Sequence, residues 1–207
     1  MNWRPALTGI LAVGAISVLG VAVVDSSDTT TAAPAASASP SASVAPAAPV
    51  KPATVPGSSP PVSISIPAIG VQAMLGTPLG LNPDGTVQVP PTSTPDIPAW
   101  FGLGTRPGDP GNSVIIGHVD GDKMLGVFHG LNKLVAGDPI KVVRENGTTV
   151  TFNVTAVETV KKSTFPSQAV YGPTTETWLA LVTCGGRFDA TTGNYEDSVI
   201  AFAKLAS

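Results

Sequence analysis

The sequence predicts a small all-β domain behind an extended N-terminal region, and three observations carry this prediction. First, residues 62–207 contain 18 glycines and 12 prolines, which separate short apolar runs. Second, no window in this part sustains the apolar periodicity of a helix over three turns. Third, Asn146-Gly147 stands between two β-rich runs, and this dipeptide is a strong signal for a tight hairpin turn. Many short strands at this spacing favour a β-barrel or a sandwich.

The strand segments can be assigned along the chain from composition and turn residues. The apolar run over residues 177–183 is continuous rather than alternating, which predicts a strand covered on both faces. Residues 132–135 and 166–170 are each expected to form a short helical turn. The expected strands are residues 62–67, 71–75, 86–89, 113–117, 140–145, 148–160, 177–183 and 198–204.

An uncharged apolar segment lies near the start of the chain, at residues 6–24. At about 1.5 Å per residue, a helix of this length approaches the roughly 30 Å thickness of the hydrocarbon core of a bilayer. Arg4 precedes the segment, and Asp25 and Asp28 follow it, which favours a cytoplasmic N-terminus and an exported remainder. Residues 1–24 are therefore expected to be a single-pass membrane anchor or, alternatively, a cleaved signal peptide.

A low-complexity linker is expected at residues 25–61. Ala, Ser, Pro and Thr supply 30 of its 37 residues, and it has no aromatic residue, Leu or Ile. Such a composition cannot bury enough apolar surface to offset the entropy lost on ordering. The remaining part, residues 62–207, is long enough for one independent folded domain.

Composition excludes several functions. The net charge of −3 does not suit a nucleic-acid-binding face, so we expect no nucleic-acid partner. A single cysteine excludes an intrachain disulfide and a cysteine-cluster metal site. Asp109, Asp120 and Asp122 have no calcium-loop spacing and are interpreted as solvated turn residues. We therefore expect no metal and no cofactor.

Two expected buried strands end in residues that can perform nucleophilic chemistry. Cys184 follows one apolar run, and His118 follows another. An ionised thiol is a strong nucleophile, and an imidazole can take its proton and pass one to a leaving amine. Backbone N–H groups near Gly185 and Gly186 could stabilise an oxyanion. From spacing alone, Cys184 could instead be an inert buried thiol, and His118 could be a structural histidine. For the second histidine, His129, the structural interpretation is favoured more strongly.

An arginine could also stabilise an oxyanion in such a site. The chain has four arginines, and Arg4 belongs to the N-terminal segment. Arg106, Arg144 and Arg187 are therefore the candidates, with a solvated loop charge as the alternative for Arg187. Arg144 is the weakest of the three because it lies on an expected exposed strand.

Several motifs, in order along the chain, resemble the sortases, which are membrane-anchored cysteine transpeptidases, and in particular their actinobacterial class F. The stretch that most resembles class F is residues 80–90 (GLNPDGTVQVP), together with the later Trp100. The resemblance covers roughly residues 62–207. The other matching segments are residues 64–71 (ISIPAIGV), 114–120 (VIIGHVD), 127–131 (VFHGL), 137–140 (GDPI) and 181–186 (LVTCGG).

The resemblance implies an eight-stranded sortase β-barrel with one or two short helices. It implies that Cys184 is the nucleophile and His118 the general acid/base, while Thr183 and Gly185 belong to the oxyanion and substrate region. In many members an arginine begins the last strand, but Ser198 stands near that position here. Arg187 is the arginine that follows Cys184 in the sequence, so it is our candidate for the catalytic arginine. No role is carried over to His129.

The resemblance also implies the reaction and the partners. We expect cleavage of an LPXTG-like sorting signal at the Thr–Gly bond through a thioester acyl-enzyme. An amine on a peptidoglycan precursor or a pilin lysine would then accept the acyl group, and otherwise water would do so slowly. The expected location is the cell membrane, with the catalytic domain outside, and the expected state is a monomer.

Two alternatives remain open at this level. One is another exported Cys/His acyltransferase, such as an L,D-transpeptidase, although the Ser-His-Gly-Cys motif of that family is absent around Cys184. The other is a non-enzymatic exported β-domain that binds a wall polymer or a protein partner. In that case Cys184 would be an inert core residue.

Overall fold

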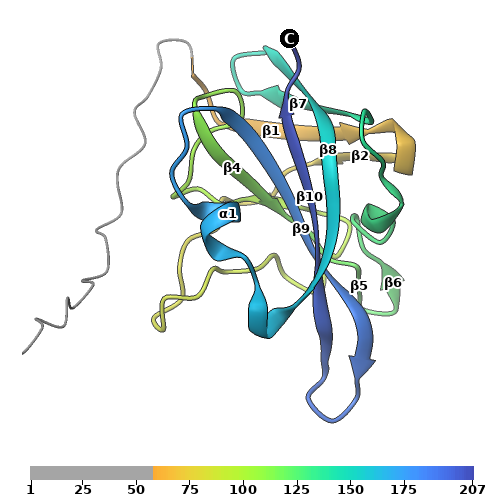
Figure 1. The fold of residues 1–207 in the computed structure, drawn as a ribbon. Helices are drawn as coiled ribbons and strands as arrows, with labels where there is room; N and C mark the ends of the chain where they lie inside the picture. The colour runs from red at the N-terminus through yellow and green to blue at the C-terminus, as the bar shows by residue number, and fades with distance from the viewer. Residues whose placement is uncertain (1–57) are drawn as a thin grey trace, which may run out of the picture. The chain divides into compact units, whose positions relative to one another are not determined.

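Residues 58–207 are described by the computed structural model, and they form a curled eight-stranded sheet with few helices (Figure 1). The strand order is β2-β1-β7-β8-β10-β9-β4-β3, which confirms the expected all-β architecture. Strands β4 and β9 run parallel, whereas the other neighbouring pairs of this sheet are antiparallel. The strands of the sheet are β1 (Pro61–Ile66), β2 (Val71–Met74), β3 (Ala99–Trp100), β4 (Gly111–Ile116), β7 (Pro139–Arg144), β8 (Thr149–Lys161), β9 (Thr177–Asp189) and β10 (Asn194–Leu205).

The remaining elements are short and lie in the connections. A separate two-stranded ladder follows β4, and the helical elements have three to five residues each. The two expected helical turns are present as η2 and α1. These elements are β5 (Asp120–Gly121), β6 (Met124–Leu125), η1 (Pro67–Ile69), η2 (Leu131–Lys133), η3 (Lys162–Thr164) and α1 (Ser167–Tyr171).

Seven of the eight predicted strands are present within a few residues, and the predicted strand at residues 86–89 is wrong. Val87 makes only an isolated bridge to Leu81, and Val89 is 62% exposed. The hydrogen bonds of this segment are local, as between the Asn82 N–H and the Thr86 carbonyl at 2.8 Å. Its valines therefore belong to a compact loop, because no neighbouring strand is available to pair with them.

The Asn146-Gly147 turn joins β7 and β8 as predicted. Gly147 has a φ of 81°, a conformation that glycine adopts without steric cost. The Gly147 N–H donates to the carbonyl of Arg144 at 2.9 Å, which closes the turn.

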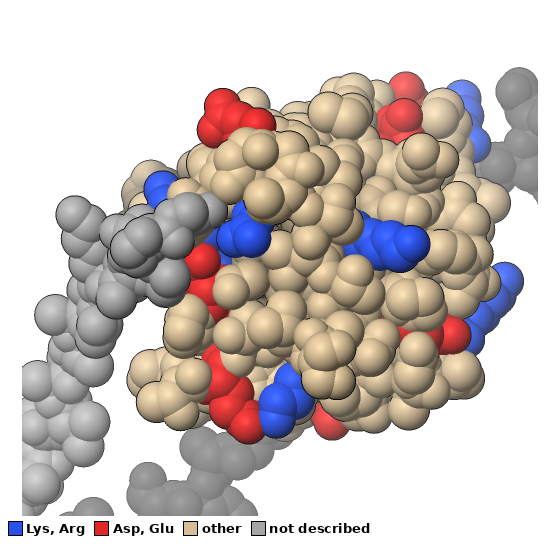
Figure 2. All heavy atoms as spheres, turned by 90° about the horizontal axis from the view of Figure 1, so that it is seen from above, with Lys and Arg blue, Asp and Glu red and all other residues tan. Residues whose placement is uncertain are grey.

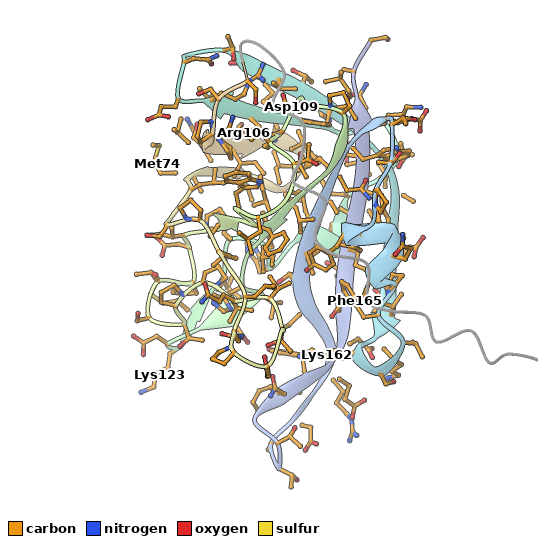
Figure 3. All side chains as sticks on the ribbon, turned by 90° about the vertical axis from the view of Figure 1, so that its left-hand side faces the viewer. Met74, Arg106, Asp109, Lys123, Lys162 and Phe165 are labelled. Atoms are coloured by element: carbon orange, nitrogen blue, oxygen red, sulfur yellow. The ribbon has the colours of Figure 1, made fainter. Side chains whose placement is uncertain are left out.

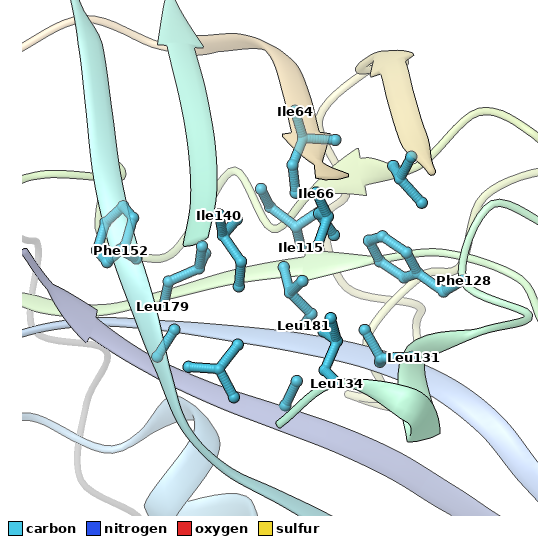
Figure 4. Close-up of a cluster of buried hydrophobic side chains, with 14 of the residues drawn as sticks. Ile64, Ile66, Ile115, Phe128, Leu131, Leu134, Ile140, Phe152, Leu179 and Leu181 are labelled. Carbon is cyan, nitrogen blue, oxygen red and sulfur yellow. The ribbon is translucent and has the colours of Figure 1, made fainter. Parts of the chain in front are cut away.

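The core has two layers because the central strands are buried on both faces. Leu179, Leu181 and Ile115 point into the larger cluster, shown in Figure 4, while Ala180 and Val182 belong to a second cluster on the opposite face. This alternation explains why the strand is apolar at every position. Burying each large side chain contributes roughly 1.5–3 kcal/mol. The strand that leads to Cys184 is thus held firmly on both sides.

The surface of the described part carries few charges. Figure 2 shows lysines, arginines and carboxylates scattered between large uncharged areas, consistent with the 12% of charged residues in the whole sequence. Within residues 58–207, no helix has the length and hydropathy needed to cross a bilayer. The expected anchor at residues 1–24 and most of the expected linker lie outside the described residues.

Candidate active site

The pairing of β4 with β9 brings His118 alongside Cys184. The two strands run parallel with Ile116 opposite Val182, and the Gly117 N–H donates to the Val182 carbonyl at 3.1 Å. Adjacent strands lie about 4.8 Å apart, and side chains two residues apart share a face. Cys184 lies two residues beyond Val182 on β9, and His118 lies two residues beyond Ile116, just past the end of β4, so the two residues stand at the same end of neighbouring strands. Both residues are half-buried.

His118 is held by the long loop that connects β2 and β3. Its Nε2 lies 2.7 Å from the carbonyl oxygen of Pro90. Because a carbonyl can only accept, Nε2 carries the hydrogen, and in the neutral ring Nδ1 is the nitrogen left to exchange a proton. The backbone is held as well, since the Phe128 N–H donates to the His118 carbonyl at 3.0 Å. A Cβ at Gly126 would lie 2.2 Å from that carbonyl, so only glycine fits there.

Cys184 lies within β9, which continues through it to Asp189, farther than the sequence predicts. The strand can continue because Gly186, with a φ of 74°, and a register shift in β10 accommodate a bulge just after the cysteine. Gly185 is buried, and a Cβ there would lie 2.6 Å from Val199 Cγ2. The backbone beside the thiol is therefore closely packed, while the thiol itself remains half-buried and unpaired.

Thr183 points away from the face that carries Cys184. It lies opposite Val199, which belongs to the larger core cluster. Its hydroxyl is buried, and within residues 58–207 no hydrogen-bond partner reaches it. Thr183 can therefore contribute to the thiol side of the sheet through its backbone rather than through its hydroxyl.

The three candidate arginines lie in two different places. Arg187 follows Cys184 by three residues on β9, and its guanidinium donates from Nε and Nη2 to Glu196. Arg144 lies 4.0 Å from Asp109, and Arg106 contacts Ser58.

These last two arginines precede or flank the start of β4, whereas His118 follows its end. A six-residue strand spans roughly 20 Å. Figure 3 shows Arg106 and Asp109 at one end of the domain, with Lys123, from the turn just after His118, at the other. Arg187 is therefore the arginine that shares the Cys184 end of the sheet within the described residues. Opposite Cys184 on β10 stands the buried Ser198.

One contact at this end was not predicted from the sequence. The hydroxyl of Tyr195 on β10 donates to the carboxylate of Asp120 on β5. This hydrogen bond, together with burial and the negative charges of Asp120 and ionised Cys184, raises the pKa of Tyr195 to about 12. The Tyr195 ring packs edge-on against Phe188 at 5.2 Å between centroids. The sequence feature that could have pointed to this contact is the position of Asp120, two residues after His118.

The other acidic residues and His129 do not add to this site. Asp109 lies at the opposite end of β4 from Asp120, so the three loop aspartates do not come together. Within residues 58–207, no group of three His, Cys, Asp or Glu side chains is placed to hold a metal ion. His129 Nδ1 lies 2.9 Å from the carbonyl of Gly126. Its side chain lines a separate groove of about 470 Å³ beside β2.

Comparisons with known proteins agree with this architecture. Residues 64–206 match the family model described as the sortase domain. Among curated proteins, no match was found.

Solved structures share the fold. A sortase D5 transpeptidase from Clostridium perfringens is 23% identical, with a TM-score of 0.50, over 70% of this chain and 78% of that one. Sortase A from Corynebacterium diphtheriae is 20% identical, with a TM-score of 0.52, over 72% and 62%. Sortase C-1 from Actinomyces oris is 19% identical, with a TM-score of 0.52, over 70% and 73%.

Proposed function

Because the chain belongs to the sortase family, we propose that it is a cysteine transpeptidase in which Cys184 is the nucleophile and His118 the general acid/base. The observation that supports this assignment is the parallel register of β4 and β9, since His118 and Cys184 each follow the last pair, Ile116 with Val182, by two residues. The half-buried setting supports it further, because a nucleophile needs both a defined position and access to substrate.

The proposed reaction has two acyl-transfer steps. The Cys184 thiolate attacks the carbonyl carbon of the scissile peptide bond, so that a C–S bond forms as the C–N bond breaks. His118 gives a proton to the departing amine. In the second step, an incoming amine attacks the thioester, a C–N bond forms, the C–S bond breaks and the thiolate returns. His118 takes the proton released by that amine. Since Pro90 occupies Nε2, the proton moves through Nδ1.

Arg187 is the proposed cation for the developing oxyanion, together with the backbone N–H groups around Gly185. In the present arrangement its guanidinium is turned to Glu196, and its side chain is 80% exposed. An exposed ion pair contributes only about 0–1 kcal/mol, so substrate can draw Arg187 away from Glu196 at little cost. A buried pairing would hold the arginine out of reach.

The proposed substrate is an LPXTG-like sorting signal, cleaved between Thr and Gly, and the proposed acceptor is an amine on a peptidoglycan precursor. Residues 80–90 and Trp100 support a class F assignment through their resemblance to that group. Residues 1–24 are proposed to anchor the protein in the cell membrane, with the domain outside and residues 25–61 as the spacer. We propose that it acts as a monomer without cofactor.

The decisive experiment is a peptide-library cleavage assay with mass-spectrometric trapping of the thioester. Wild-type protein should accumulate a peptide adduct on Cys184 and release a peptide joined to an added amine. Cys184→Ala, the matched control, should form neither. Alkylation of the native protein by iodoacetamide is the companion measurement, because an inert core thiol would react only after unfolding. A thiol that stays unreactive, with no adduct from any peptide, would contradict the proposed function.

A further inference from the structure

The hydrogen bond between Tyr195 and Asp120 links the two chain segments that carry the thiol and the imidazole. Tyr195 belongs to β10, the neighbour of the Cys184 strand, and lies opposite Phe188, four residues beyond Cys184. Asp120 opens β5, two residues after His118. The two bonded residues are 75 positions apart in the chain. The contact is therefore a tertiary link between the β9–β10 pair and the segment that follows His118.

The segment after His118 has little support of its own. The β5–β6 hairpin contains two paired positions, Asp120 with Leu125 and Gly121 with Met124. Its turn residues, Asp122 and Lys123, have φ values of 42° and 62°, a left-handed conformation that disfavours side chains with a Cβ. A hairpin this short does not persist unaided, so it needs contacts from outside.

The outside contacts of this hairpin come from two directions. From the β2–β3 loop, the Pro95 carbonyl accepts from the Val127 N–H at 2.8 Å, and Pro90 holds His118 Nε2. From the sheet, Tyr195 holds Asp120. The Pro90 and Pro95 contacts fix the residues that flank the hairpin to a loop, and the bond from the Gly117 N–H to the Val182 carbonyl fixes the chain before His118 to β9. Tyr195 adds a hydrogen bond from β10 to the hairpin itself.

We propose that Tyr195 is a positioning residue that keeps His118 in register with Cys184 by holding Asp120. The proposal rests on the proposed function for its effect on catalysis. Proton exchange between a thiol and an imidazole depends on their separation within fractions of an ångström. A hydroxyl that donates to a carboxylate makes a strong, directional bond, which suits it to fix that separation. The packing of Tyr195 on Phe188 keeps the phenol pointing at the loop.

Tyr195→Phe is the sharpest test because it removes the hydroxyl and keeps the ring on Phe188. We expect kcat to fall about tenfold, with KM within twofold of wild type. Asp120→Ala should cause a similar loss, and Asp120→Asn, whose amide oxygen still accepts, should retain more activity. The Tyr195→Phe/Asp120→Ala double variant should be no slower than the worse single variant, since both remove one interaction. Asp189→Asn, which changes a carboxylate on the β9–β10 hairpin, is the control and should be unchanged.

A second readout does not need turnover. The pH profile of Cys184 alkylation should shift in both Tyr195→Phe and Asp120→Ala and stay unshifted in Asp189→Asn, while the melting temperature of each variant falls by no more than a few degrees. Tyrosinate absorbance, measured with Tyr171→Phe in the background, should show the pKa of Tyr195 falling from about 12 toward its ordinary value of 10 in Asp120→Asn. The sign follows because the carboxylate stabilises the protonated phenol and repels the phenolate.

The outcomes separate this inference from the proposed function. Absence of transpeptidation in wild-type protein would overturn the proposed function, and the alkylation and tyrosinate measurements would still test the link. An unchanged kcat and alkylation profile in Tyr195→Phe would overturn the positioning role. So would additive losses in the double variant, because they would mean that the two residues act independently.

Discussion

The two ends of strand β4 carry the same kinds of ionic groups in opposite settings. At its start, Asp109 is 4% exposed and lies beside Arg144, whose side chain is 16% exposed. Near its other end, Arg187 pairs with Glu196 at 80% and 32% side-chain exposure. A buried pair is costly to break and holds structure, whereas an exposed pair can exchange partners cheaply. Burial, more than the presence of an arginine, therefore separates a structural cation from one available for chemistry.

The largest expected effect lies at the His118 end. Cys184→Ala should reduce transpeptidation by about a thousandfold or more, because no other thiol is present to form the thioester. The fold should survive, since the change removes one half-buried sulfur from a strand supported on both faces. His118→Ala should have a similar outcome. Peptide turnover and thermal melting, measured on the same preparations, check both halves of the expectation. Residual turnover near the wild-type rate in Cys184→Ala would refute the mechanism.

Arg187→Ala should have the next largest effect, and it sharpens the comparison directly. We expect kcat to fall by about 10²–10³, the usual cost of losing one oxyanion-stabilising group. The free energy of unfolding should change by less than about 0.5 kcal/mol, because the side chain is exposed. Arg187→Lys, which keeps charge without the planar fork, should recover part of the rate. If kcat in Arg187→Ala stays near wild type, the arginine assignment is wrong.

Arg144→Ala should show the opposite behaviour. Its removal leaves the buried Asp109 carboxylate with fewer partners, which should cost about 2 kcal/mol of stability. The kcat of the folded protein should be unchanged, because this end of β4 is about 20 Å from the thiol. Urea unfolding and steady-state kinetics separate the two effects. A fall in kcat without a fall in stability would break the distinction between the two ends.

Continuous apolar runs single out Cys184 and His118 in the sequence, while their proposed roles as nucleophile and base come from the resemblance to the sortases. Such runs require burial on both faces, and the structure places 179–182 between two core layers. The parallel pairing that brings His118 beside Cys184 is a tertiary property, and spacing along the chain does not contain it.

Other features depend on contacts that local patterns cannot encode. The valines of residues 86–89 have strand propensity, yet no partner strand lies beside them, so tertiary context overrides propensity. The bond between Tyr195 and Asp120 joins positions 75 residues apart. Whether Arg187 faces Glu196 depends on the bulge at Gly186, and a single glycine in a sequence does not predict a bulge.

The smallest expected effect concerns where the folded domain begins. The sequence predicts a boundary at residue 62, but the four residues before it contact the Arg144 end of the sheet. Ser58 Oγ donates to Asp109, the Asn146 N–H donates to Ser59 Oγ at 3.1 Å, and the Pro60 carbonyl accepts from Glu145 at 2.8 Å. Pro61 already belongs to β1.

A protein that begins at residue 62 should therefore be less stable than one that begins at residue 58, by about 1–2 kcal/mol, because hydrogen bonds of this kind contribute about 0.5–1.5 kcal/mol each. Both forms should be soluble and equally active, since the lost contacts lie at the structural end of β4. Urea midpoints and kcat of the two truncated proteins measure this. Equal midpoints would mean that these contacts add nothing to the fold, and unequal kcat would mean that the two ends of β4 are coupled.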